Sequence, residues 1–164
     1  MRVLITGAAG FIGHQLLDEL AIQHPDWTLI AADIRPLDSR GLKANVEPVL
    51  LDMGRPAQVR ACISGWKPDA IVHLATVIRP PRDMTEAHLH AIEVGGSQCL
   101  VDSALANGVR QLIVTSSGAA YGYAADKTGD HAAAVRIFED CISRWPITTR
   151  SPCREKGSQI RNRD

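Results

Sequence analysis

The sequence lacks the features that mark several classes of protein. Its 164 residues carry 18 Lys and Arg against 18 Asp and Glu, so the formal net charge is zero. No surplus of positive charge is available to hold nucleic acid or an anionic membrane surface. No apolar run is long enough to span a bilayer. We therefore expect neither nucleic acid nor a membrane as a partner.

Cysteine pairs and clustered metal ligands are also lacking. None of the four cysteines forms a Cys-x-x-Cys pair; they are Cys62, Cys99, Cys141 and Cys153. Scattered thiols favour a reduced, cytoplasmic protein. The opening apolar run meets Gly7 at once and is too short for the apolar core of a signal peptide. His88 and His90 form a His-x-His without further ligands, so we expect no metal site.

What the sequence does contain is a regular alternation of short apolar runs and helical patterns. The apolar runs predict strands at residues 2–7, 28–33, 47–52, 70–75 and 111–117. Helical periodicity predicts helices at residues 10–24, 56–66, 86–108 and 130–145. Near-continuous apolar strands followed by crossover helices form parallel sheets with both faces covered. We therefore expect an α/β, doubly wound, Rossmann-type sheet of about five strands.

A glycine-rich turn lies between the first strand and the first helix, where such turns hold a pyrophosphate. Gly7 permits the tight turn, Gly10 lets the backbone approach the phosphates, and Gly13 lets helix and strand pack closely. The start of the helix then offers N–H groups and the positive end of its dipole. The turn predicts a dinucleotide site made of Gly7, Ala9, Gly10, Phe11, Ile12 and Gly13.

The same helical pattern places six apolar residues on one stripe of the helix. Its members are Phe11, Ile12, Leu16, Leu17, Leu20 and Ala21. Pro25 ends the helix. The composition changes after residue 145, where periodicity ceases and arginines become frequent. We expect one dinucleotide-binding domain over residues 1–145 and a disordered tail over 146–164.

The end of the second strand predicts which dinucleotide is bound. Asp33 follows Gly13 by about 20 residues, the spacing at which a carboxylate binds the adenosine ribose hydroxyls. A carboxylate there repels a 2′-phosphate, which favours NAD over NADP. Arg35 stands two residues on, and an arginine can accommodate that phosphate. We expect NAD as the cofactor, with NADP as the less favoured alternative.

These motifs resemble the extended branch of the short-chain dehydrogenase/reductase superfamily, the NAD-dependent epimerase/dehydratase family, which acts largely on nucleotide sugars. The resemblance covers about residues 1–123 and includes TGAAGFIG at 6–13, HLA at 73–75 and TSSGAAYG at 115–122. It implies further cofactor contacts at Asp52, Met53, Leu74, Ala75 and Thr76. The acid of the Asp52-Met53 pair would cap the adenine.

The resemblance also implies catalytic roles. Ser117 matches the family's catalytic serine, which hydrogen-bonds the substrate oxygen. Tyr123 and Lys127 form a Tyr-x-x-x-Lys, the spacing of the family's base and its activating cation, since residues i and i+4 share a helix face. This pair follows the serine too closely, however, and a loop tyrosine with a solvated lysine is the better interpretation. No tyrosine follows Tyr123, so we expect this chain to lack the working pair.

The long third helix departs from the family pattern. The family usually has Asn-Val-x-Gly-Thr there, whereas this chain has Glu93-Val94-Gly95-Gly96-Ser97. A charge in a helix that packs on the sheet puts the usual polar role of this position in question.

Three interpretations of function remain open. The first is the NAD-binding part of an epimerase/dehydratase-like oxidoreductase that acts on a sugar-like alcohol by hydride transfer. The second is a non-catalytic NAD-binding module. The third is a C-terminally truncated or frame-shifted product without function. Because no later strand is visible, the strand containing Leu112, Ile113 and Val114 is expected to be an open edge that favours self-association.

Overall fold

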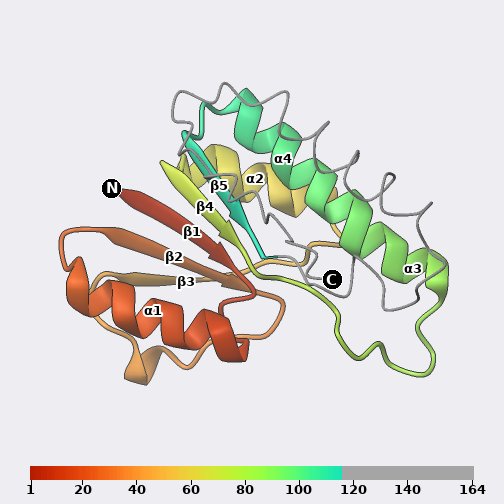
Figure 1. The fold of residues 1–164 in the computed structure, drawn as a ribbon, viewed down its shortest axis with the longest axis horizontal. Coiled ribbons are helices and arrows are strands. Elements are labelled where there is room, and N and C mark those ends of the chain that lie inside the picture. The colour runs from red at the N-terminus through yellow and green to blue at the C-terminus, as the bar shows by residue number, and fades with distance from the viewer. Residues whose placement is uncertain (116–164) are drawn as a thin grey trace, which may run out of the picture. The chain divides into compact units, whose positions relative to one another are not determined.

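The computed structural model describes residues 1–115; the predicted helix at 130–145, the domain boundary at 145 and the predicted tail lie outside this part. Five parallel strands form one sheet in the order β3-β2-β1-β4-β5 (Figure 1). They are β1 (Arg2–Thr6), β2 (Thr28–Asp33), β3 (Val46–Leu50), β4 (Ala70–His73) and β5 (Gln111–Val114). The strand order reverses at β1, which confirms the predicted doubly wound fold.

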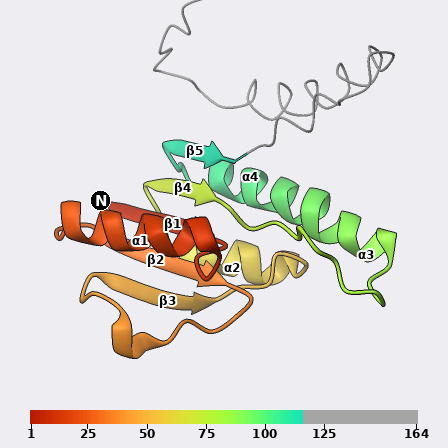
Figure 2. The ribbon, with the colours of Figure 1, turned by 60° about the horizontal axis from the view of Figure 1, so that its bottom comes forward.

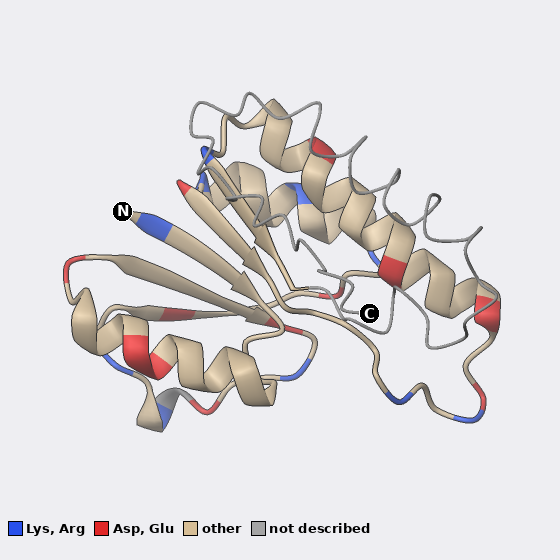
Figure 3. Cartoon of the chain, viewed as in Figure 1, with Lys and Arg blue, Asp and Glu red and all other residues tan. Residues whose placement is uncertain are grey.

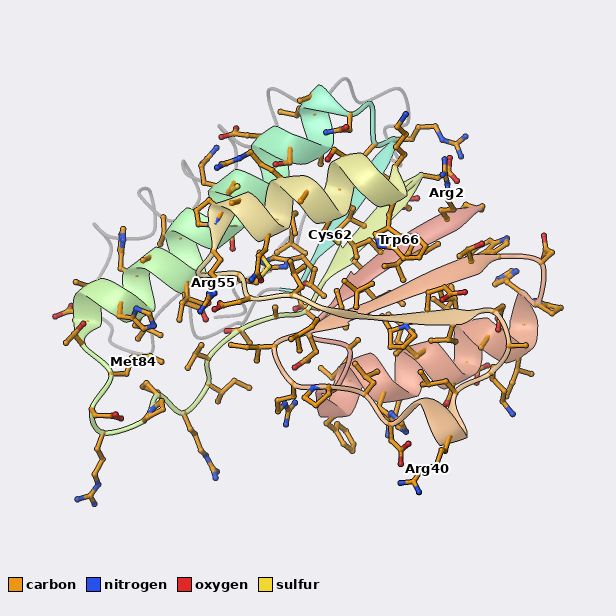
Figure 4. The ribbon with its side chains drawn as sticks, turned by 180° about the vertical axis from the view of Figure 1, so that it is seen from behind. Arg2, Arg40, Arg55, Cys62, Trp66 and Met84 are labelled. Carbon is orange, nitrogen blue, oxygen red and sulfur yellow. The ribbon has the colours of Figure 1, made fainter. Side chains whose placement is uncertain are left out.

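Helices cover both faces of the sheet. One face carries α1 (Phe11–Gln23), and the other carries α2 (Pro56–Trp66) and α4 (Ser97–Ala106), which pack against each other. Seen from behind, α2 and α4 lie in front of the strands, with Cys62 and Trp66 on the side of α2 that faces the sheet (Figure 4). Right-handed crossovers place the helices in this way because the chain moves outward from β1 in both directions.

The predicted helix at 86–108 is present but is not uniform. It consists of α3 (Glu86–His90), a π-helical turn η2 (Ala91–Gly96) and α4. The chain leaves α4 at Asn107, and Gly108 has the positive φ of 69° that favours glycine after a helix. A short 3₁₀ helix, η1 (Ser39–Gly41), lies between β2 and β3.

The two middle strands form the centre of the core. Side chains alternate between the faces, so Val3 and Ile5 pack with Leu17 of α1, whereas Leu4 points to the opposite face. In β2, every residue from Leu29 to Asp33 is buried. Burial on both faces explains why these strands read as continuous apolar runs.

The outer strands differ from the middle ones. β3 and β5 lie at opposite edges of the sheet (Figure 2), and β3 carries Pro48, which cannot donate to a ladder. Among the described residues, β5 pairs only with β4, from Ala70↔Gln111 to His73↔Val114. Ile113 and Val114 are 46% and 36% exposed.

The apolar stripe of α1 is buried only in part. Leu17 and Ala21 are buried and Leu16 and Leu20 are partly buried, but Phe11 and Ile12 are 81% and 59% exposed. The two exposed residues are the first two of α1.

Charged residues of both signs are interspersed along the described chain (Figure 3). Within the part that the structure describes, no helix has the length and apolar character needed to cross a membrane.

Candidate functional site

A cavity of about 760 Å³ lies at the carboxyl edge of the sheet. In open parallel sheets, ligands bind in the crevice outside the carboxyl ends of the strands, where the strand order reverses. Residues that follow all five strands line this cavity, from Asp52 after β3 to Thr115 after β5. Its volume lies within the range of small-molecule and cofactor sites.

The cavity brings together nearly all of the residues predicted to contact a cofactor. Those that line it are Gly7, Gly10, Phe11, Ile12, Gly13, Asp33, Arg35, Asp52, Met53, Leu74, Ala75 and Thr76. Ala9 does not line it, but its backbone holds Asp33 and Arg35, as described below. Phe11 and Ile12, the two exposed residues at the start of α1, therefore form part of the cavity wall.

The glycine turn packs so closely against neighbouring backbone that side chains are sterically excluded at two of its positions. Gly7 has a φ of 71°, and a Cβ there would lie 2.7 Å from the backbone N of Ala75. A Cβ on Gly13 would lie 2.3 Å from the carbonyl O of Gly7, so the helix can approach the strand only with glycine at this position. The glycines therefore bring β1, α1 and the end of β4 into close contact.

The first turn of α1 presents its backbone to the cavity. Gly10 is the N-cap, no side chain caps the turn, and no acidic residue lies in it. The N–H groups of Phe11, Ile12 and Gly13 have no acceptor within the helix, because the first N–H groups of any helix lack one. Together with the dipole, they make this end of the cavity attractive to an anion.

Asp33 joins the end of β2 to the glycine turn. Its Oδ2 accepts the N–H of Ala9 at 3.0 Å, and its Oδ1 accepts the N–H of Arg35 at 2.9 Å. The Arg35 side chain bends back: its Nε lies 3.4 Å from Asp33 Oδ1, and its Nη2 donates to the carbonyl of Ala9 at 2.9 Å. The carboxylate is 7% exposed. Arg35 therefore ties the turn to Asp33 as well as lining the cavity.

Asp52 occupies the corresponding place after β3. Its Oδ1 accepts the N–H of Gly54 at 2.8 Å, and its Oδ2 lies 3.2 Å from Nε of Arg55. These contacts turn the chain into α2 and leave the Asp52 carboxylate at the cavity wall. Met53, beside it, is buried.

A buried polar chain links the ends of β1 and β4 to α4. His73 is 6% exposed, and its Nδ1 lies 2.7 Å from Oγ1 of Thr6 while its Nε2 lies 3.0 Å from Oγ of Ser97. Oγ1 of Thr6 also accepts the N–H of Ala75 at 3.4 Å. Burial lowers the pKa of His73, and the charge of Glu93 acts against that lowering. A neutral imidazole therefore fits this position.

Glu93, the departure from the family pattern, does have a polar role. Its Oε1 accepts the N–H of Val77 at 2.5 Å, and its Oε2 accepts the hydroxyl of Thr76 at 3.1 Å. Thr76 and Val77 begin the loop that leaves β4 and line the cavity. The sequence pattern missed this function because the acceptor and its donors are 16 and 17 residues apart, on different elements.

Other cavity residues were also missed from the sequence. They are Thr6, Ala32, Ile34, Leu51, Val77, Ile78, Arg79, Pro81, Met84, Ile92 and Thr115. Five of these eleven belong to the loop between β4 and α3, which carries no motif. The hydroxyl of Thr115, directly after β5, donates to the carbonyl of His73 at 3.4 Å.

The predicted catalytic residues Ser117, Tyr123 and Lys127 lie outside the described residues. Among residues 1–115, no group of three or more His, Cys, Asp or Glu side chains could hold a metal ion.

Comparison with known proteins identifies the family. The sequence profile of the NAD dependent epimerase/dehydratase family matches residues 3–141. The chain belongs to this family. A family member from Burkholderia thailandensis, dTDP-L-rhamnose 4-epimerase, is 31% identical over 140 residues, which are 79% of this chain and 38% of the relative. UDP-glucose 4-epimerase from Mycolicibacterium smegmatis is 34% identical over 123 residues, covering 72% of this chain and 39% of the relative.

Solved structures agree with the epimerase/dehydratase fold. A variant of uronate dehydrogenase from Agrobacterium tumefaciens, complexed with NAD, is 31% identical with a TM-score of 0.60, covering 75% of this chain and 43% of that chain. The Bordetella bronchiseptica enzyme WbmG in complex with NAD is 25% identical with a TM-score of 0.66, covering 77% and 41%. The chain thus spans about two fifths of the length of the relatives it matches.

Proposed function

We propose that residues 1–115 form the NAD-binding part of an oxidoreductase of the epimerase/dehydratase family. The observation that carries this proposal is the glycine turn: Gly7, Gly10 and Gly13 line the cavity, and the first turn of α1 that follows has no side-chain cap. A pyrophosphate fits such a turn because it is anionic and accepts several N–H bonds. Asp33 on one side supplies the acceptor that a ribose diol requires.

NAD is the expected cofactor, in preference to NADP. The buried carboxylate of Asp33 already receives two backbone N–H groups, which hold it in place for ribose hydroxyls and against a 2′-phosphate. Arg35 is engaged with Asp33 and with the carbonyl of Ala9. Solved relatives in complex with NAD support the same assignment.

The reaction proposed for the family context is hydride transfer between NAD and an alcohol of a sugar or nucleotide sugar. The names of the relatives, which include epimerases of dTDP- and UDP-sugars, support this substrate class. Ser117 is the proposed contact to the reacting oxygen. Because Tyr123 is the last tyrosine of the sequence and follows Ser117 closely, we expect the 164-residue chain to turn over little or no substrate.

Calorimetric titration of the 164-residue chain with NAD and with NADP tests the binding proposal. We expect NAD to bind more tightly than NADP. Asp33→Asn should reduce this difference in affinity. Equal or tighter binding of NADP to the unmodified chain would contradict the role of Asp33. Failure of both dinucleotides to bind a folded sample would contradict the proposed function.

Gly10→Val tests the glycine turn itself. The added side chain would occupy the approach to the pyrophosphate, so we expect binding to be lost while the fold persists, since a Cβ at Gly10 meets only the carbonyl of Gly7 at 3.1 Å. Gly65→Val is the matched control, because a Cβ at this exposed position of α2 has nothing within 4 Å. Unchanged NAD affinity in Gly10→Val would show that the turn does not hold the phosphates.

Activity assays with NAD and nucleotide sugars address the catalytic part. A missing acid–base group costs about 10²–10⁴-fold in rate, so little turnover is expected. A robust NAD-dependent rate that disappears in Tyr123→Phe would contradict this expectation and identify Tyr123 as the base. Turnover below detection, together with NAD binding, would favour a non-catalytic binding module.

A further inference from the structure

The carboxylate of Glu93 lies behind one end of the cavity. It belongs to the π-helical turn η2, which lies between α3 and α4. Its two oxygens take the Val77 N–H and the Thr76 hydroxyl, so its charge is held against the first two residues of the β4–α3 loop. Glu93 itself is only partly exposed and does not line the cavity.

The topology places this carboxylate at the end opposite the adenosine site. Along the carboxyl edge, the cavity passes from Asp52 and Asp33, through the glycine turn after β1, to Thr76 after β4 and Thr115 after β5. A dinucleotide with its pyrophosphate on the glycine turn and its adenosine ribose on Asp33 must extend its nicotinamide half toward β4 and β5. That half would rest on the loop that Glu93 holds.

The two redox forms of the cofactor differ in charge at that half. The oxidised nicotinamide ring carries a positive charge and the reduced ring is neutral. A fixed negative charge near the ring stabilises the oxidised form and leaves the neutral form nearly unaffected. We propose that Glu93 is a positioning residue that also biases the cofactor site electrostatically toward the oxidised dinucleotide. This inference rests on the proposed function, namely that the cavity binds NAD.

The charge of Glu93 reaches the neighbouring strand end. It opposes the effect of burial on the pKa of His73, whose ring lies at the carboxyl end of β4. Arg79 lines the same cavity and contributes a positive charge. Arg79 is present both in the unmodified chain and in any variant at position 93. A change in the ratio of the NAD⁺ and NADH affinities between them therefore reports the effect of Glu93 alone.

Glu93→Gln separates charge from hydrogen bonding. The amide keeps an oxygen for the Val77 N–H and can donate its NH₂ to the Thr76 hydroxyl, so the loop stays tied while the charge is lost. We measure dissociation constants of NAD⁺, NADH and ADP. The expected result is a loss of preference for NAD⁺ over NADH of about three- to tenfold, with ADP affinity unchanged, because ADP reaches only the other end of the cavity.

Two further variants complete the test. Glu93→Ala removes both the charge and the hydrogen bonds, so we expect it to weaken both dinucleotides by about tenfold or more, again without affecting ADP. Glu86→Gln removes the same charge from the exposed first turn of α3 and should leave all three affinities unchanged.

Several outcomes would overturn the inference. An unchanged NAD⁺/NADH ratio in Glu93→Gln, or equal weakening of both forms, would show that Glu93 acts without an electrostatic bias. Loss of ADP binding in the same variant would show a structural effect on the whole domain. If the unmodified chain binds ADP but neither dinucleotide, or binds none of the three, the proposed function fails instead, and the two failures are thereby distinguished.

Discussion

β2 and β5 have similar sequences and very different surroundings. TLIAAD in β2 and QLIV in β5 are both short apolar runs. In β2, Leu29 and Ile30 are completely buried, whereas in β5 Ile113 is 46% exposed. β2 has neighbours on both sides, β1 and β3, while β5 pairs with β4 alone among residues 1–115. The position of a strand in the sheet thus decides how far its side chains are buried, and the core is centred on β1 and β2.

The largest expected effect concerns the point where α1 packs on this core. In Gly13→Ala, the new Cβ would lie 2.3 Å from the Gly7 carbonyl and 2.7 Å from Cα of Ala8, both of them backbone atoms that cannot move aside easily. We expect this variant to lose its cooperative fold or to show a severe drop in the midpoint of thermal unfolding. Circular dichroism measures either effect. Gly65→Ala, in open space on α2, should instead stabilise the domain by about 0.5–1 kcal/mol. Similar midpoints for the two variants would show that the close approach at Gly13 is dispensable.

A matched pair of leucines measures the difference between the two strands directly. Leu29→Ala in β2 removes a fully buried side chain and should lower the free energy of unfolding by about 2–5 kcal/mol. Leu112→Ala in β5 removes a partly exposed one and should cost about 1 kcal/mol. Urea denaturation of both variants provides the values. Equal losses would mean that β5 is buried as completely as β2 in the folded chain.

A pH effect is expected from β4, the strand between the centre and the edge. Burial lowers the pKa of His73 below its ordinary value of 6.5. At a pH between the lowered pKa and about 6.5, His73 is therefore neutral in the folded chain and takes up a proton when the chain unfolds. The unfolded state then binds more protons, and the free energy of unfolding falls as pH drops below about 6.5. Urea denaturation between pH 5 and 7.5 should show this slope, and His73→Gln should flatten it. His88 is exposed, so His88→Gln should retain the pH dependence of the unmodified chain. An equal slope in the unmodified chain and in both variants would exclude His73 as its source.

The smallest expected effect on stability concerns the side of β5 away from β4, where no strand among residues 1–115 pairs with it. An apolar strand with unpaired N–H and C=O groups favours edge-to-edge association, so we predict concentration-dependent self-association in sedimentation experiments. Val114→Lys should weaken it with little change in the free energy of unfolding, because Val114 is already 36% exposed. Strong amide protection of all residues 111–115 in a demonstrably monomeric sample would contradict the prediction, because a strand paired on one side protects only the amides that face β4.

Local patterns were sufficient to predict the five strands, the helices within residues 1–115 and the glycine turn. Gly7, Gly10 and Gly13 are separated by three residues, and their functions depend on the strand and helix that directly adjoin them. Asp33 was found in the same way, as the polar residue that ends a buried strand. Each of these sequence patterns lies within a few residues of the strand or helix on which its interpretation depends.

The features that the sequence patterns did not predict depended on contacts between distant segments. Phe11 and Ile12 lie on the apolar stripe of α1 by periodicity, but they are exposed and line the cavity. The single helix expected at 86–108 contains a π-helical turn, and Gly96 in that turn sits so close to Met53 that a Cβ would lie 2.6 Å from its carbonyl O. Periodicity describes one helix at a time and contains no information on what the helix will meet.

The sequence by itself determined the family, the parallel α/β class and the glycine turn at which we propose that a pyrophosphate binds, because short-range spacing of glycine and apolar residues specifies them. The tertiary structure decided which apolar strands are buried, how Arg35 and Asp33 share the glycine turn, and that Glu93 holds the loop after β4. These features arise only when β1, β4 and the helix containing Glu93 are brought to the same edge of the sheet. A carboxylate in a sequence is simply a charge, and its partners are selected by the fold that surrounds it.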